Sequence, residues 1–166
     1  MQFTIRNATP ADLPVVLAMN EAAVPHVSSL SAAGMQDLYE EAAWFRVAAR
    51  PDDDGLAAFL IGLTPEARYD SPNFLWFRRN YPSFAYIDRV AVADDARRGG
   101  LGTALYQDFE TSFRDRAPLL ACEVNLRPAN PASMEFHRRR GFTQAGSQVI
   151  DNGNKEVAMM VKELGR

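Results

Sequence analysis

Cysteine and histidine are scarce in this chain, and their scarcity excludes several kinds of chemistry. Among 166 residues there is one cysteine, Cys122, and there are two histidines, His26 and His137. A lone cysteine can form no internal disulfide and cannot build a cysteine-based metal site. Two histidines are too few for a histidine-rich metal centre. We therefore expect no metal cofactor.

Long apolar segments and an excess of basic charge are also missing. No apolar run approaches the roughly 20 residues that cross a bilayer, and the first residues lack the layout of a signal peptide. The chain has 18 Lys and Arg residues against 21 Asp and Glu residues, a formal net charge of -3. This balance argues against a generally basic nucleic-acid binder. We expect a cytoplasmic protein with no membrane and no nucleic-acid partner.

Length and composition fit a single globular domain over residues 1–166. Hydrophobic residues make up 47% and charged residues 23% of the chain, and both values are near the soluble average. One core of this size removes roughly two-thirds of the unfolded chain's surface from water. No repeat or linker suggests a second domain.

Hydrophobic periodicity predicts strands alternating with helices. Helices are expected over residues 10–23, 35–46, 100–116 and 130–140, and Phe45 to Ala49 could instead open a strand. Strands are expected around Phe3 and Ile5 and over residues 56–63, 84–92, 119–124, 142–150 and 156–161. The cluster Asp52, Asp53, Asp54 and Gly55 predicts an acidic hairpin tip. Residues 25–34 are expected to form a loop.

Residues 64–83 are the longest expected connection. They include three prolines and the aromatic residues Tyr69, Phe74, Trp76, Phe77 and Tyr81. Long loops in compact domains tend to be functional or disordered, and the aromatic content argues against disorder. These side chains could wrap an acceptor molecule, or form a satellite core or a homodimer contact.

A glycine-rich turn follows the strand predicted over residues 84–92. Gly99, Gly100 and Gly102 surround the start of a helix, and Arg97 and Arg98 stand beside them. Glycines allow close approach of a ligand to the backbone, and the first amides of a helix lack intrahelical acceptors. Such a turn can bind phosphate. It could also be a plain helix start with solvated arginines.

Two common nucleotide-binding motifs do not fit this turn. No Lys-Ser or Lys-Thr pair follows the glycines, as a P-loop requires. A dinucleotide fold has Gly-x-Gly-x-x-Gly after a first strand, whereas Leu105 occupies the third glycine position here and the strand is central.

Two motifs resemble those of the GNAT superfamily of N-acetyltransferases. The run from Arg97 to Gly102 is similar to the family signature Gln/Arg-x-x-Gly-x-Gly/Ala, and Asn130 with Ser133, followed by Gly141-Phe142, is similar to a second family motif. The sharp motifs lie between residues 86 and 142. The resemblance implies a mixed α/β fold, with a mostly antiparallel, partly splayed sheet of about seven strands flanked by about four helices.

The resemblance also implies an acetyl-CoA site. Backbone amides of the turn would bind the pyrophosphate, through Arg97, Arg98, Gly99, Gly100, Leu101, Gly102 and Thr103. The strand backbone of Val90, Ala91 and Val92 would run beside the pantetheine. Asn125, Asn130, Ser133, Phe136 and His137 would complete the contacts. Asn130 could instead be a plain helix cap, Asn125 an ordinary loop residue and Phe136 a core residue.

Catalytic candidates follow from the same resemblance. His137 stands where the family usually has a tyrosine proposed to protonate the leaving thiolate, although phosphinothricin-type members also have histidine. Asp88 and Tyr86 are candidate proton acceptors for the amine, and Glu123 is a third. The alternative for Asp88 is a salt bridge with an arginine. Cys122 is expected to be a buried strand residue and not a nucleophile.

The implied reaction is direct transfer of an acetyl group from acetyl-CoA to a primary amine of a small molecule or peptide. Backbone amides of the strand over residues 84–92 would stabilise the developing oxyanion. Acceptor contacts are expected from Asn20, His26 and Ser29, and from Phe74, Trp76 and Tyr81. The alternatives are a coenzyme A-binding sensor or degenerate module without transferase activity, and a structural partner-binding protein.

Overall fold

The computed structural model describes residues 2–53 and 55–165, and the chain divides into two compact units. The first unit comprises Met1–Leu63 and Ile87–Ser112, and the second comprises Thr64–Tyr86 and Phe113–Arg166. The strands follow the order β1-β2-β3-β4-β5-β7-β6. The single domain expected from the sequence stays a prediction.

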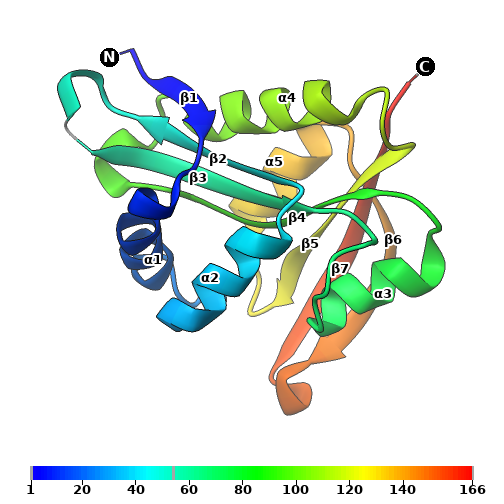
Figure 1. Cartoon of the computed structure of the whole chain (residues 1–166). Coiled ribbons are helices and arrows are strands. Elements are labelled where there is room, and N and C mark those ends of the chain that lie inside the picture. The colour runs from blue at the N-terminus through cyan, green and yellow to red at the C-terminus, as the bar shows by residue number, and fades with distance from the viewer. Residues whose placement is uncertain (1, 54, 166) are drawn as a thin grey trace. The chain divides into compact units, whose positions relative to one another are not determined.

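The first unit contains neighbouring strands, the first three of which pair in antiparallel fashion, together with helices (Figure 1). Its strands are β1 (Thr4–Asn7), β2 (Trp44–Ala49), β3 (Leu56–Leu63) and the larger part of β4 (Ala85–Val92). Its helices are α1 (Leu13–Ala22), α2 (Ala32–Glu41) and most of α4 (Leu101–Phe113). Phe59, Leu105 and Phe109 are fully buried in its core. The prediction of a strand over residues 56–63 is confirmed by β3, whose apolar residues are buried along almost the whole strand.

The second unit holds α3 (Pro72–Asn80), the start of β4, β5 (Leu119–Arg127), α5 (Pro131–Arg139), β6 (Thr143–Ile150) and β7 (Lys155–Glu163). Strands β5, β7 and β6 pair in antiparallel fashion. β4 pairs with β5 in parallel, and among the described residues its register rests on two pairs, Ala85 with Leu120 and Tyr86 with Ala121. The expected mixed α/β fold with a mostly antiparallel seven-stranded sheet is confirmed.

The first helical turns begin at a side-chain cap. The Asp12 carboxylate accepts hydrogen bonds from the Thr9 amide at 2.8 Å and the Thr9 hydroxyl at 3.1 Å. Arg6 donates to the same carboxylate at 2.7 Å, and this contact is the main reason that the pKa of Asp12 falls to about 2. Thr9 and Asp12 thus form a capping box, and Pro10 follows Thr9 at the start of the helical segment. A short 3-10 turn, Pro10–Asp12, precedes α1.

The expectation of a loop over residues 64–83 was wrong in part. The described residues contain five α-helices, one more than expected, because α3 occupies Pro72–Asn80. Proline is compatible with the first helical turn, where its missing N–H would be unpaired anyway, and Pro72 occupies that place. Phe74 and Phe77 lie three residues apart and are fully buried, so they form the inner face of this helix.

The bounds of α2 and β2 also differ from those expected from the sequence. α2 begins at Ala32 instead of residue 35, because the Ser31 hydroxyl caps it by accepting from the Gly34 amide at 3.0 Å. It ends at Glu41, and the alternative of a strand near residues 45–49 is confirmed by β2. Asp54, part of the predicted acidic hairpin tip, lies outside the described residues.

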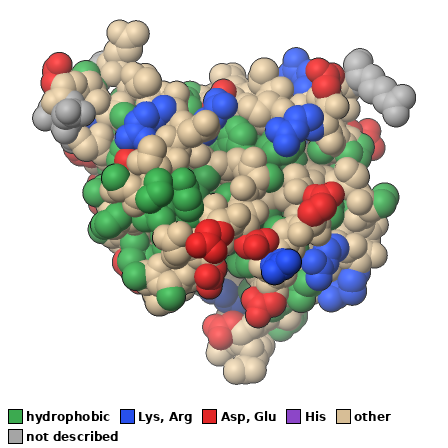
Figure 2. All heavy atoms as spheres, viewed as in Figure 1, with side chains coloured by type: hydrophobic (Ala, Val, Ile, Leu, Met, Phe, Trp, Pro, Cys, Tyr) green, Lys and Arg blue, Asp and Glu red, His purple; other side chains and the backbone are tan. Residues whose placement is uncertain are grey.

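Surface charge is mixed. On the face shown in Figure 2, acidic and basic side chains both occur, with hydrophobic and uncharged polar side chains between them. This agrees with the small net charge of -3. In the described part of the chain, no helix is long and apolar enough to cross a membrane.

Candidate active site

The glycine-rich turn of the first unit is open to solvent, and two of its residues have a left-handed backbone conformation. Arg98 has φ of 66° and Gly100 has φ of 79°. Gly100 is exposed, and a Cβ added at Gly100 or Gly102 would meet no atom within 4 Å. α4 begins immediately afterwards at Leu101 and runs for 13 residues. The turn therefore presents the N-terminal amides of a full-length helix beside unobstructed backbone.

Arg97 is engaged locally. Its guanidinium pairs with Asp94 at 3.1 Å and donates to the Val92 carbonyl oxygen at 3.4 Å. The side chain is 59% exposed, and an exposed ion pair of this kind contributes little in water. The backbone amides of the turn are therefore better placed than Arg97 to bind an anion.

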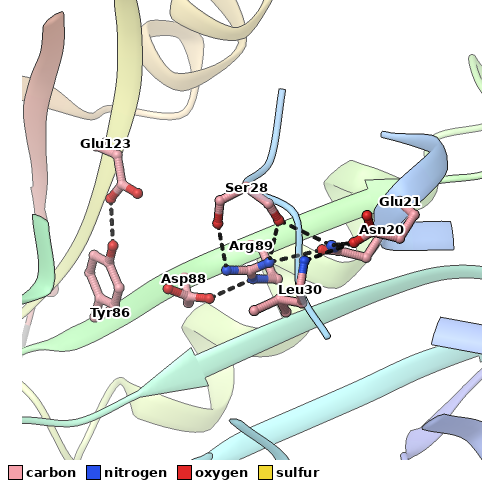
Figure 3. Close-up of polar contacts among 8 residues, drawn as sticks. All are labelled: Asn20, Glu21, Ser28, Leu30, Tyr86, Asp88, Arg89 and Glu123. Carbon is pink, nitrogen blue, oxygen red and sulfur yellow. Dashed lines mark hydrogen bonds and ion pairs between the residues drawn. The ribbon is translucent and has the colours of Figure 1, made fainter. Parts of the chain in front are cut away.

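Asp88 forms a buried ion pair in β4. Its carboxylate lies 2.7 Å from Nε of Arg89, and the two side chains are 3% and 4% exposed. The same guanidinium donates to the Asn20 side-chain oxygen at 2.9 Å and to the carbonyl oxygen of Ser28 at 3.0 Å (Figure 3). The alternative expected for Asp88, a salt bridge with an arginine, is thus what the structure contains.

Asn20 was expected to contact the acceptor, but its side chain lies in the interior of the first unit. It is fully buried, and its amide nitrogen donates to Glu21 at 3.0 Å and to the Ser28 carbonyl at 3.1 Å. A side chain that is enclosed and hydrogen-bonded in this way is not available to contact an acceptor. Ser29 and His26 are exposed, and the Ser29 hydroxyl donates to Glu21 at 2.6 Å.

Tyr86 and Glu123 form a pair in the second unit. The phenol donates to a Glu123 carboxylate oxygen at 2.7 Å (Figure 3). Tyr86 has no exposed surface and packs against the rings of Phe74 and Phe77, whereas Glu123 is half-buried on β5. Tyr86 is therefore placed to orient Glu123.

His137 is buried on α5 with a defined ring tautomer. Nδ1 lies 2.7 Å from the Ser133 carbonyl oxygen, which can only accept, so Nδ1 carries the hydrogen. Burial lowers the pKa of His137, which favours the neutral ring. In that ring Nε2 holds a lone pair and has no proton to give. This arrangement argues against the expected role of His137 as an acid.

The start of α5 matches the predicted cap. The side-chain oxygen of Asn130 accepts from the Ser133 amide at 3.2 Å, and Pro131 follows at the first helical position. The Asn130 amide donates to the Asn125 carbonyl at 3.3 Å, which ties the end of β5 to the helix. Phe136 is half-buried, with its ring edge-on to His137 at a centroid distance of 5.3 Å.

Comparison with known proteins identifies the family. Residues 27–142 match the acetyltransferase (GNAT) family. The chain belongs to this family. It is 31% identical over 151 residues to the L-methionine sulfoximine/L-methionine sulfone acetyltransferase of Pseudomonas aeruginosa, covering 88% of this chain and 83% of that protein. The chain is accordingly an N-acetyltransferase, and the expectation from its two motifs is confirmed.

Solved structures agree with this GNAT assignment. Ard1 from Thermoplasma volcanium superposes with a TM-score of 0.79 at 20% identity, covering 100% of both chains. The ribosomal-protein-alanine N-acetyltransferase from Brucella melitensis superposes with a TM-score of 0.74 at 25% identity, covering 97% of this chain and 99% of that one. GNAT membership implies acetyl-CoA as the co-substrate.

The GNAT turn fits such a ligand. Side chains at Gly100 and Gly102 would occupy the open space beside the α4 amides, and their absence leaves it clear. Helix N-terminal amides bind phosphate because they are unpaired and lie at the positive end of the dipole. Among the residues that the structure describes, no group of three or more His, Cys, Asp and Glu side chains could hold a metal ion.

Cys122 and the aromatic candidates lie mainly in the interior of the second unit. Cys122 is buried on β5, as expected, and burial raises the pKa of its thiol. Phe74, expected at the acceptor, has no exposed surface, so its contacts are with the core. Trp76 and Tyr81 are half-buried, with ring centroids 6.5 Å apart.

Arg89 is the residue that sequence reasoning missed. A signal was available, since a second charged residue directly follows Asp88 in an apolar strand. Successive strand residues point to opposite faces, so the pairing of these two neighbours could not be expected from the strand pattern.

Proposed function

We propose that this GNAT enzyme acetylates the primary amine of a small molecule of the amino-acid type, with acetyl-CoA as donor. Its 31% identity to an acetyltransferase named for L-methionine sulfoximine and L-methionine sulfone carries the proposal. The relatives by fold include one named for a ribosomal-protein alanine, so a peptide amine is the second candidate.

Acetyl-CoA supplies the acetyl group as an activated thioester. We assign its pyrophosphate to the amides from Arg97 to Thr103, where the backbone is open and left-handed at Arg98 and Gly100. The remaining assignments follow the family: the backbone of Val90, Ala91 and Val92, and the side chains of Asn125, Asn130, Ser133 and Phe136. They remain proposals.

We assign proton acceptance to Glu123. An amine must lose a proton to become neutral and bond to the acetyl carbon, and a positioned carboxylate can take that proton. Glu123 is half-buried, and the hydrogen bond donated by the Tyr86 phenol orients its carboxylate. Asp88, by contrast, would lose its ion pair with Arg89 if it took up a proton. Tyr86 positions Glu123, and we assign no proton transfer to His137.

The test is release of free thiol from acetyl-CoA across an amine panel. The panel contains L-methionine sulfone, L-methionine sulfoximine, L-methionine and a short peptide beginning with alanine, and each product is identified by mass. Saturable turnover with the sulfone or sulfoximine supports the proposal. Turnover with the peptide alone replaces it by the second candidate. Acetyl-CoA binding without turnover on any member would point to a coenzyme A-binding module instead.

We further propose a cytoplasmic location and, from the exposed part of the α3 aromatics, a homodimer. Fractionation and light scattering check these two points.

A further inference from the structure

Arg89 is a buried cation whose role the proposed chemistry does not include. It lies on β4, and the residue as a whole is 5% exposed. Burying a guanidinium is costly unless its donors are matched by acceptors. A buried arginine on the strand that carries Asp88 therefore needs a reason.

The Arg89 fork joins three separate pieces of the first unit. Nε donates to Asp88 at 2.7 Å, and Nη1 donates to the Asn20 side-chain oxygen at 2.9 Å, so β4 is tied to the end of α1. Nη1 also donates to the Ser28 carbonyl at 3.0 Å, and Nη2 to the Ser28 hydroxyl at 3.1 Å. A guanidinium can donate to all three residues at once, because its N–H donors are fixed in one plane and point in different directions.

Ser28 belongs to the connection between α1 and α2, residues 23–31, which has few apolar anchors. Most of its residues are exposed or half-buried, His26 and Ser29 among them. Its order depends on polar contacts instead. Glu21 accepts from the Leu30 amide at 2.8 Å and from the Ser29 hydroxyl at 2.6 Å, and Arg89 holds Ser28 (Figure 3). A segment with so few buried apolar contacts opens readily when such bonds are removed.

We propose that Arg89 is a positioning residue that sets the affinity for the acceptor amine. By holding Ser28 against β4, it fixes the position of residues 26–30, which carry the exposed side chains of His26 and Ser29. A serine hydroxyl and an imidazole nitrogen can accept hydrogen bonds from a small cationic amine. This inference rests on the proposed function, because it names what sets the affinity of the same enzyme for its acceptor.

The central experiment compares Arg89→Lys with a matched control, Arg46→Lys. Lysine keeps the positive charge but offers one point of donation and cannot serve Asp88, Asn20 and Ser28 together. Arg46 pairs with Asp108 at 2.6 Å in the same unit, away from residues 23–31 in its contacts. For R89K we expect the acceptor KM to rise about tenfold, with kcat and the KM for acetyl-CoA within about twofold. For R46K all three constants stay within about twofold.

Hydrogen exchange supplies a readout apart from activity. In R89K the amides of residues 26–30 should exchange about tenfold faster, while the strands β2 and β3 keep their protection. An unchanged acceptor KM in folded R89K overturns the proposal. Equal rises in both KM values, with exchange faster throughout the chain, also overturn it, because that pattern means a general structural role.

A second variant keeps the test decisive if R89K does not fold. Glu21→Gln weakens the hold on Leu30 and Ser29 but leaves the Arg89 contacts with Asp88 and Ser28 in place. We expect its acceptor KM to rise about threefold, with faster exchange at residues 29–30. Faster exchange at residues 29–30 with a wild-type acceptor KM would overturn the proposal, because the order of this segment would then not set the affinity for the acceptor. If the wild-type enzyme acetylates no amine in the panel, the proposed function fails separately, and exchange in these variants alone then decides whether Arg89 orders the connection.

Discussion

Asp88 and Glu123 are both acidic residues within apolar strands, yet the two units surround them differently. In the first unit, Asp88 is paired with a cation, and both side chains are 3% to 4% exposed. In the second unit, Glu123 is half-buried and accepts a hydrogen bond from the neutral phenol of Tyr86 at 2.7 Å. The Asp88 carboxylate is committed to its ion pair with Arg89, whereas the Glu123 carboxylate is oriented by an uncharged donor, and we propose that it accepts the amine proton. The same residue class, in the same sequence pattern, thus supports two different roles.

Glu123→Gln should have the largest effect. If Glu123 accepts the amine proton, the amide removes that function while keeping the size of the side chain and an acceptor for Tyr86. We expect kcat to fall roughly a thousandfold, in the range of general-base contributions, with acetyl-CoA binding retained. Thiol-release kinetics and calorimetry measure the two quantities. A kcat within threefold of wild type would contradict the assignment of Glu123 as proton acceptor, and with it the contrast between Glu123 and Asp88.

Asp88→Asn should act mainly on stability. Asparagine can still accept from Arg89, but the buried guanidinium loses its countercharge. We expect the free energy of unfolding to fall by about 2 kcal/mol, measured by urea denaturation, with kcat reduced far less than in E123Q. Loss of kcat equal to that of E123Q, at unchanged stability, would instead make Asp88 the proton acceptor.

Tyr86→Phe isolates the orienting hydrogen bond. The ring stays packed against Phe74 and Phe77, so only the phenol oxygen is lost. We expect a loss of about 1 kcal/mol in stability and a drop in kcat of about fivefold, with the KM for acetyl-CoA unchanged. The comparison with Y39F, a tyrosine of α2 with its ring against Phe45, controls for removal of a phenol. Full activity in Y86F would show that Glu123 needs no orientation.

Asp12→Asn should have the smallest effect, and Asp12 serves as a reference for a carboxylate whose cationic partner is partly exposed. Its pKa is about 2 in the folded protein against an ordinary value of 3.8, so the ionised carboxylate stabilises the fold at pH values above about 3.8. That contribution disappears as pH falls from about 4 to 2. Because Arg6 is 41% exposed, we expect the contribution to be about 1 kcal/mol at neutral pH. Urea denaturation of Asp12→Asn and wild type at several pH values should show curves that converge at the acidic end. Parallel curves down to pH 2 would contradict the assignment.

Local signals were enough to place much of the fold and the motifs of the site. The apolar run from Leu56 to Leu63 predicted β3 to the residue, and Asn130-Pro131 predicted the start of α5. These features depend on neighbours in sequence, through side-chain period and cap chemistry. α3 was missed because prolines around an aromatic segment indicate a loop locally, while the burial of Phe74 and Phe77 that stabilises the helix is tertiary.

The sequence by itself determined the family and the glycine-rich turn, since both reside in contiguous motifs from residue 97 to residue 142. The partners of the polar side chains were decided only by the tertiary structure. Asn20 and Arg89 are 69 residues apart, and Tyr86 and Glu123 are 37 apart. Which residue a buried donor meets depends on how strands and helices pack, because its hydrogen-bond partner must come from whatever the fold brings within about 3 Å.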